Sequence, residues 1–200
     1  MHLKIKHLLF ILIFAHCLIL IPGNNCLSPT PSLAQQSKQS KQHEYLLKSV
    51  FMERFTRFVQ WPEPFIEKNK DQHFIISVMG PNPFGDILQT VFSRQPIKGK
   101  PVEIRLLNTL SDISGCHMLF IGKTDSQSLS NIVNYSKKFP VLTISDNNGY
   151  ADNGVHINMY VENGQIRFEI NNAAASASKL NISYLLLKLA RIVEARGDQS

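Results

Sequence analysis

The sequence predicts an α/β fold in which a mostly parallel sheet lies between two layers of helices, with an antiparallel hairpin at one edge of the sheet. Short, β-branched apolar runs alternate with segments of helical periodicity over the first two thirds of the chain, which favours parallel strands joined by right-handed crossovers. Two alternating runs then flank Asn163-Gly164, the strongest local signal for a hairpin. We therefore expect a three-layer sandwich with helices on both faces of the sheet.

The first residues have the composition of a secretory signal peptide. Lys4 and Lys6 precede an almost wholly apolar run over residues 8–21, and the small-x-small pattern at residues 32–34 follows as a cleavage site. The run is short for a membrane span, which needs about 20 apolar residues, although an uncleaved anchor is an alternative. The sequence predicts cleavage after Ala34 and a periplasmic mature protein.

The mature chain is predicted to form one domain. Residues 35–42 are polar and low in complexity, so we expect a flexible leader there. It separates the signal peptide of residues 1–34 from a single α/β domain over residues 43–196. That length suits one hydrophobic core, and no internal repeat or linker divides it.

Each predicted element follows from its periodicity. A helix over roughly residues 43–60 ends before Pro62, and its apolar stripe includes Leu47, Phe51, Phe55 and Phe58. Strands are then predicted at residues 74–79, 102–107, 117–121 and 140–144, with helices at residues 84–93 and 125–136. The hairpin joins residues 155–161 to residues 165–170. A short helix at residues 173–178 precedes a last helix over residues 182–195, whose stripe is Leu185, Leu186, Leu189, Ile192 and Val193.

Charge and motifs argue against several functions. The net charge of the chain, +6, is modest, and its lysines and arginines are scattered along the sequence. We therefore expect no nucleic acid polymer as a partner. The four histidines after the leader lie outside any metal-ligand spacing, and no metal site is predicted; they are His43, His73, His117 and His156. The chain carries no nucleophile elbow, dinucleotide fingerprint or phosphate-binding loop. We therefore expect no cofactor and no enzymatic activity.

Cysteine is scarce after the leader. Cys17 lies in the signal peptide, and Cys26 is expected to be removed with it; a lipoprotein at Cys26 is disfavoured because asparagines precede it where small residues are expected. Cys116 is then left as a single thiol, so no internal disulfide framework is expected. We predict that Cys116 is buried, with an exposed, redox-active thiol that pairs between chains as the alternative. His117 follows directly, but neighbours in a strand point to opposite faces and do not form a dyad.

Four residues are candidates for ligand or partner binding. Arg57 lies one helical turn before Trp61, and such a pair could hold an anionic or planar ligand, or merely pack together. Asp146 begins a polar loop after a strand, at the sheet edge where open α/β folds bind ligands. Arg167 alternates with apolar neighbours in a strand and should point away from the core, towards water or a partner carboxylate.

Several segments, taken in order, resemble the YfiR family of periplasmic proteins over roughly residues 43–194. The ordered set, rather than any single motif, carries the resemblance. Its segments are residues 45–47, 57–62, 80–85, 115–122, 140–146, 167–171 and 186–193.

The resemblance implies a homodimeric α/β sandwich that binds and represses the periplasmic sensor region of an inner-membrane diguanylate cyclase. Release of the cyclase would raise cyclic di-GMP and favour biofilm formation. Cell-wall or redox stress is the implied trigger. Cys116 matches a family cysteine, but the second cysteine of a redox pair is missing from the mature chain.

Two further hypotheses stay open at this point. The protein could be a periplasmic receptor for a small ligand or cell-wall fragment that signals to another membrane protein, such as a histidine kinase. Such a receptor needs a concave pocket near Arg57, Trp61 or Asp146. An unrecognised hydrolase would need a nucleophile or an acid buried in a cleft, and the sequence offers no candidate. The inhibitor hypothesis instead expects an exposed apolar patch.

Overall fold

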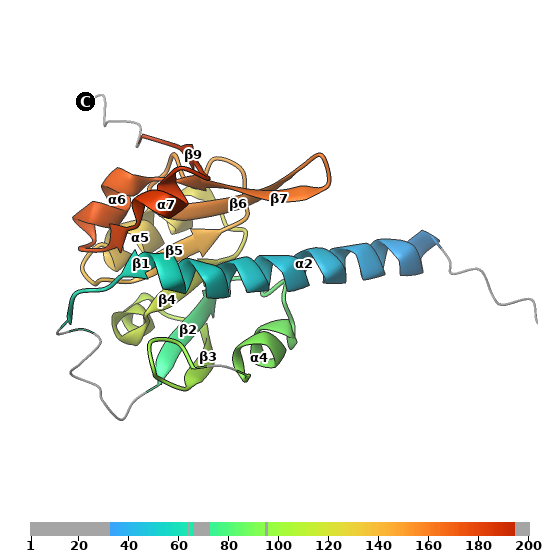
Figure 1. Cartoon of the computed structure of the whole chain (residues 1–200), viewed down its shortest axis with the longest axis horizontal. Coiled ribbons are helices and arrows are strands. Elements are labelled where there is room, and N and C mark those ends of the chain that lie inside the picture. The colour runs from blue at the N-terminus through green and yellow to red at the C-terminus, as the bar shows by residue number, and fades with distance from the viewer. Residues whose placement is uncertain (1–32, 64, 66–72, 95, 195–200) are drawn as a thin grey trace, which may run out of the picture. The chain divides into compact units, whose positions relative to one another are not determined.

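A computed structural model describes residues 33–63, 65, 73–94 and 96–194 (Figure 1). Most of the predicted signal peptide therefore lies outside the described residues. The chain divides into two compact units, residues 1–37 and 38–200. Of the first unit, the structure describes only an exposed helical segment, residues 33–37, whereas the second unit contains the sheet and its helices. Within the described ranges, none of the helices combines the length and the hydropathy needed to cross a membrane.

The described residues form a seven-stranded sheet in the order β3-β2-β4-β5-β6-β7-β9. Its strands are β2 (Phe74–Met79), β3 (Val102–Leu107), β4 (Met118–Ile121), β5 (Leu142–Ser145), β6 (Ile157–Glu162), β7 (Gln165–Ile170) and β9 (Arg191–Ile192). Neighbours from β3 to β6 are parallel, β6 and β7 form the antiparallel hairpin, and β9 is parallel to β7. This arrangement confirms the predicted fold class. The short β9, which was not predicted, extends the sheet beyond the hairpin.

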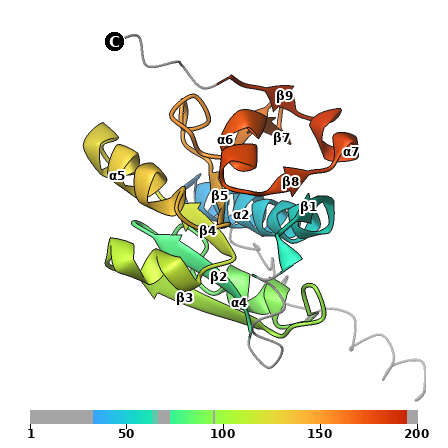
Figure 2. The ribbon, with the colours of Figure 1, turned by 90° about the vertical axis from the view of Figure 1, so that its left-hand side faces the viewer.

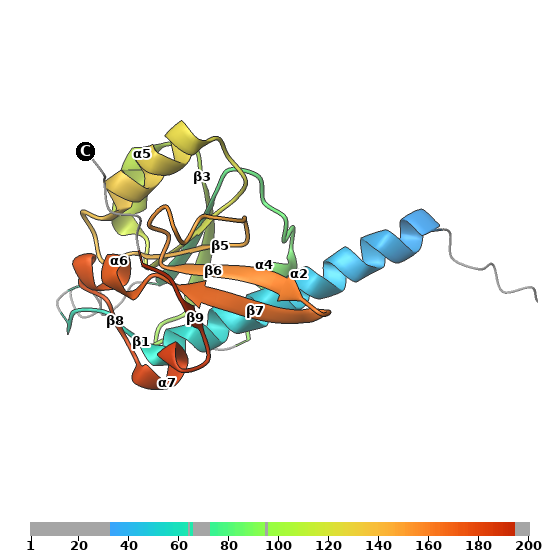
Figure 3. The same ribbon diagram turned by 90° about the horizontal axis from the view of Figure 1, so that it is seen from above.

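Helices cover both faces of the sheet. Helices α2 (Leu33–Phe58) and α4 (Ile87–Phe92) pack on one face, and α5 (Ser126–Ser136) and the 3-10 helix η1 (Leu110–Gly115) pack on the other. In Figure 3 the strands lie between α5 and α2. Strand β2 supplies both cores in alternation, because Phe74, Ile76 and Val78 join the α2 side whereas Ile75 and Met79 join the α5 side.

Local sequence signals set several element boundaries. Asn163 and Gly164 have φ angles of 51° and 72°, which the tight turn between β6 and β7 requires. The Asp125 carboxylate accepts a hydrogen bond from the Ser128 backbone N–H at 2.9 Å and so caps α5 as predicted. Helix α4 begins later than the predicted residue 84, because Gly85 has a left-handed φ of 54°.

The first helix differs from its prediction at both ends and in its buried face. Residues 35–42, predicted as a flexible leader, belong to α2, since extending an existing helix needs no new nucleation and these residues include favourable helix formers. The helix ends at Phe58 and is followed by β1 (Val59–Gln60). Leu47, predicted as part of the apolar stripe, is exposed, whereas Lys48 and Met52 are buried.

The predicted last helix over residues 182–195 is wrong. Strand β8 (Asn181–Ile182) pairs with β1 in a separate two-stranded sheet, and β9 pairs with β7. Strand pairing at both ends leaves room for one helical turn, α7 (Tyr184–Leu187), capped by the Ser183 side chain. Helix α6 (Asn172–Ala177) lies before β8, close to its predicted position, and Figure 2 shows β8 beside β1.

Candidate functional site

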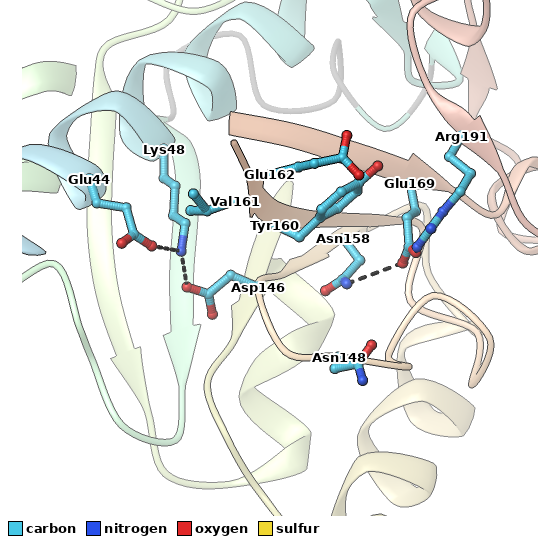
Figure 4. A pocket seen from close by; sticks show the side chains of 10 residues that line it. All are labelled: Glu44, Lys48, Asp146, Asn148, Asn158, Tyr160, Val161, Glu162, Glu169 and Arg191. Atoms are coloured by element: carbon cyan, nitrogen blue, oxygen red, sulfur yellow. Dashed lines mark hydrogen bonds and ion pairs between the residues drawn. The ribbon is translucent and has the colours of Figure 1, made fainter. Parts of the chain in front are cut away.

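A surface pocket of about 430 Å³ lies where α2 meets the outer end of the sheet (Figure 4). Five elements contribute to it: α2, the loop after β5, both strands of the hairpin and β9. The lining residues are Glu44, Lys48, Asp146, Asn148, Asn158, Tyr160, Val161, Glu162, Glu169 and Arg191. The polar loop at the carboxyl end of β5 therefore faces a pocket, as the sequence predicted for Asp146.

One side of the pocket is built around a buried lysine. The Lys48 ammonium lies 2.5 Å from a Glu44 carboxylate oxygen and 2.6 Å from Asp146 Oδ2, and it also sits 4.6 Å from the centroid of the Tyr45 ring. The Lys48 side chain is 4 % exposed, so its charge depends on these two carboxylates. Burial, followed by the charge of Asp146, raises the pKa of the Tyr45 hydroxyl well above its usual range.

The opposite side is built around a buried glutamate. Glu169 forms an ion pair with Arg191 and accepts a hydrogen bond from Asn158 Nδ2 at 3.2 Å. The Arg191 guanidinium also lies 5.0 Å from the centroid of the Tyr160 ring. The Asn158 side chain is buried, and its Oδ1 atom has no hydrogen-bond partner among the described residues. A buried amide oxygen without a donor carries a free-energy cost, and because this atom is shielded from solvent, a molecule in the pocket does not reach it.

The charges of the pocket define what it can accept. Lys48 and Arg191 are both engaged by carboxylates, and Glu162 adds a further acidic side chain to the lining. A free anion would meet more carboxylates than cations, whereas a ligand with N–H, O–H or ammonium donors would find carboxylate acceptors in the lining. Among the described residues, no three His, Cys, Asp or Glu side chains are placed to hold a metal ion.

The other three candidate residues lie outside this pocket. Arg57 is exposed and pairs with Glu53, with Arg57 Nη2 2.8 Å from Glu53 Oε1. Trp61 is buried, and its indole N–H donates to the His117 carbonyl at 3.1 Å. The structure therefore does not join Arg57 and Trp61 into one site. Arg167 is exposed on β7 and donates to the Gln165 side chain at 2.9 Å.

Cys116 is fully buried, as predicted. Its Sγ lies 2.9 Å from Ser77 Oγ, and burial raises the pKa of the thiol. A buried thiol with a raised pKa is a poor nucleophile and cannot reach another chain, which argues against the redox alternative. His117 points to the other side of the strand, where its ring stacks on Phe74 with the centroids 4.7 Å apart. The predicted separation of the two side chains is confirmed.

A second surface feature lies beside the pocket. Four large apolar side chains from one segment are more than half exposed, and we call them the C-terminal apolar surface: Tyr184, Leu185, Leu189 and Ile192. They come from α7, the turn after it and β9, which follow one another along the chain and lie near each other in Figure 1. Apolar residues exposed together in this way are typical of a binding surface.

A family model described as YfiR/HmsC-like matches residues 45–191. The match spans most of the chain, from the start of the buried part of α2 to β9. The chain belongs to the YfiR/HmsC-like family. This confirms the resemblance found in the sequence. A comparison of the whole chain with curated proteins gave no significant match.

Most pocket residues of this YfiR/HmsC-like protein were not predicted from the sequence. Lys48 could have been noticed, because it lies at helical spacing from Tyr45 and Met52, three residues after the one and four before the other. Asn158 sits in an alternating strand as the one amide among apolar residues. Glu169 and Arg191 carried no local signal of their pairing, because their contact depends on β9, which was predicted as helix.

Proposed function

We propose that this YfiR/HmsC-like protein is exported to the periplasm, binds the periplasmic sensor region of an inner-membrane diguanylate cyclase and holds that cyclase inactive. Membership of the family supports a regulatory role of this kind. The observation that carries the binding mode is the C-terminal apolar surface. Its four side chains expose area that a monomer would normally bury, and a partner would remove that area from water.

Binding is tested with the mature chain and the periplasmic region of a membrane cyclase encoded beside it. Calorimetry should give micromolar affinity or better, about −8 kcal/mol. Leu185→Asp/Leu189→Asp should weaken binding by roughly 100-fold, because two buried carboxylates would face an apolar partner. Leu46→Asp, an exposed leucine on α2, is the matched control and should bind like the parent. Equal binding by both variants would overturn the proposed surface.

Repression and export have separate tests. Deleting the gene should raise cyclic di-GMP in a host that keeps the cyclase, and the Leu185→Asp/Leu189→Asp chain should fail to restore the low level. Unchanged cyclic di-GMP in the deletion strain would contradict repression.

Mass spectrometry of the periplasmic protein should give a mature N-terminus at Gln35, whereas an intact N-terminus would support an uncleaved anchor.

A second candidate function is favoured by the pocket. We propose that a small ligand with donor groups, such as a cell-wall sugar, binds there and donates hydrogen bonds to the carboxylates of the lining, Glu162 among them. The acidic lining disfavours phosphates, so N-acetylglucosamine disaccharide should raise the melting temperature whereas GMP should not. Glu162→Ala should reduce the shift most, because it removes an accessible acceptor of the lining, and Asn148→Ala, at the pocket rim, should weaken it less. A shift that is equal in the parent and Glu162→Ala would contradict this site.

A further inference from the structure

The C-terminal apolar surface has a lysine in its midst. Lys188 is exposed, and along the chain it lies between Tyr184 and Leu185 on one side and Leu189 and Ile192 on the other. Tyr184 and Leu189, at 69 % and 72 %, are the two most exposed large apolar side chains that the structure describes. The Lys188 ammonium lies 5.1 Å from the centroid of the Tyr184 ring, so this positive charge sits close to the apolar side chains.

The segment that carries this surface contains cations and lacks acids. Between Glu169 and Glu194 the sequence has no aspartate or glutamate, but it has three cations, Lys179, Lys188 and Arg191. Arg191 is turned back to Glu169 by their ion pair, whereas Lys179 and Lys188 are exposed. The segment therefore presents apolar side chains together with a positive charge that no acid of its own offsets.

This combination of side chains suits a lipid surface better than the core of a protein interface. Lysine is depleted in such cores, because an ammonium buried between two proteins needs a carboxylate partner. At a bilayer surface the stem of the lysine lies among the upper acyl chains while its ammonium reaches the headgroup phosphates. Tyrosine favours the same depth, because its ring is apolar and its hydroxyl is polar.

We propose that the C-terminal apolar surface docks on an anionic phospholipid bilayer while the protein is not bound to a protein partner. In the docked state Leu185 and Leu189 enter the boundary between headgroups and acyl chains, and Lys188 contacts the phosphates. Given the export proposed above, this bilayer is the periplasmic leaflet of the inner membrane, the membrane that would also hold the cyclase. Binding to lipid does not itself depend on the proposed function.

The test is co-sedimentation of the mature chain with lipid vesicles. The mature chain keeps the whole compact unit of residues 38–200 and lacks the apolar residues 8–21, which would bind lipid by themselves. It should bind vesicles that contain phosphatidylglycerol at least about tenfold more strongly than vesicles of phosphatidylcholine alone. Binding to the anionic vesicles should weaken as salt is added, because salt screens the attraction between lysine and phosphate.

Two charge reversals locate the surface. Lys188→Glu should weaken binding to the anionic vesicles by about tenfold or more, because it replaces a cation at the bilayer by an anion. Lys138→Glu is the matched control, since Lys138 is also exposed and also lies over a tyrosine ring, 4.6 Å from the centroid of Tyr135. It lies directly after α5, in the other helix layer, and the variant should bind like the parent.

A second measurement reports the depth of insertion. Leu189→Trp keeps the surface apolar and places an indole on it, whereas Trp61, the single tryptophan of the chain, is buried. Anionic vesicles should shift the emission of the new indole to shorter wavelength, and lipids brominated along their acyl chains should quench it. An emission that vesicles leave unchanged, a parent chain that stays in the supernatant, or equal binding by Lys188→Glu and Lys138→Glu would overturn the proposal.

The lipid proposal and the proposed function fail separately. A chain that binds anionic vesicles but not the periplasmic region of the cyclase would contradict the proposed function alone. A chain that binds the cyclase region but never the vesicles would overturn the lipid proposal alone. With both in place, the cyclase region should release the chain from the vesicles, because one surface cannot contact both, and undiminished vesicle binding at saturation would overturn the docking surface.

Discussion

The middle of the sheet and its outer end at β9 differ in how far their residues are buried. Every residue of β2, β4 and β5 is buried, and the polar side chains among them are bonded, as in the Ser145 hydroxyl that donates to the Ile121 carbonyl at 2.8 Å. At the outer end, β9 has two residues, both exposed. The difference indicates that the middle supplies stability, whereas the outer end leaves surface exposed for binding.

The largest expected effect is a loss of stability at low pH, and it comes from two buried histidines in the middle of the sheet. Burial lowers the pKa of His156 to about 3 and that of His117 to about 4, below the value near 6.5 in an unfolded chain. The unfolded chain therefore takes up these protons first as the pH falls. The part of the unfolding free energy that depends on these two neutral histidines is fully present above pH 6.5 and is lost as the pH falls towards 4. The loss is at most about 1.4 kcal/mol per pH unit for each histidine.

Urea unfolding between pH 7 and pH 4.5 measures this loss. We expect about 2 to 3 kcal/mol from each histidine over that window. His156→Gln should remove one proton from the pH dependence, because its ring no longer titrates in the unfolded chain. Gln127→Ala, an exposed substitution on α5 that changes no titratable group, is the control and should keep the slope of the parent. A parent chain whose stability is flat over this range would contradict the assignment.

The next effect compares two ion pairs on one helix. Lys48→Met leaves Glu44 and the nearly buried Asp146 facing each other without a cation, which should cost about 2 to 4 kcal/mol of unfolding free energy. Arg57→Met breaks the same i,i+4 arrangement with Glu53 at an exposed position and should cost less than about 0.5 kcal/mol.

The double variant Lys48→Met/Asp146→Asn sharpens this comparison. Removing the buried acid together with its cation should recover at least half of the lost stability, as measured by urea unfolding. If Lys48→Met is no more costly than Arg57→Met, then burial at the pocket contributes nothing to the strength of that pair.

The sequence predicted the middle of the sheet far better than its outer end. The run at residues 74–79 is apolar and β-branched throughout, and it forms a strand with the predicted bounds. The segment after Ser183 has five apolar residues at helical spacing, yet it forms one turn and then a strand. Periodicity could not reveal this, because the outcome depends on β1 and β7, which are far away in the sequence and offer backbone partners.

The sequence predicted only the part of the candidate site that follows from the topology of the sheet. Asp146 follows a parallel strand, and the carboxyl edge of such strands is a general place for ligands. Arg57 and Trp61 were paired on helical spacing, but the chain leaves the helix at Phe58, between them, and Trp61 turns into the core. Lys48 and Glu169 became part of the pocket through contacts with residues about 98 and 22 positions away, which single-sequence patterns do not encode.

The smallest expected change in stability concerns an ion pair at the outer end of the sheet. Arg191→Ala removes the cation from Glu169, whose side chain is 7 % exposed and keeps only the amide of Asn158 as a donor. We expect a loss of about 1 to 3 kcal/mol, because a buried carboxylate loses its charged partner. Arg167→Ala, an exposed arginine on the neighbouring strand, should cost less than about 0.5 kcal/mol.

Hydrogen exchange separates the local from the global consequence of Arg191→Ala. Because β9 is held to β7 by only two paired residues, the loss of Arg191 should speed exchange at the Val193 amide, which donates to the Ile170 carbonyl, while amides of β4 stay protected. Partner binding should weaken as well, since Ile192 belongs to the C-terminal apolar surface and moves with β9. Uniformly faster exchange across β4 and β9 would instead mean that the two regions unfold together and that the outer end has no independent stability.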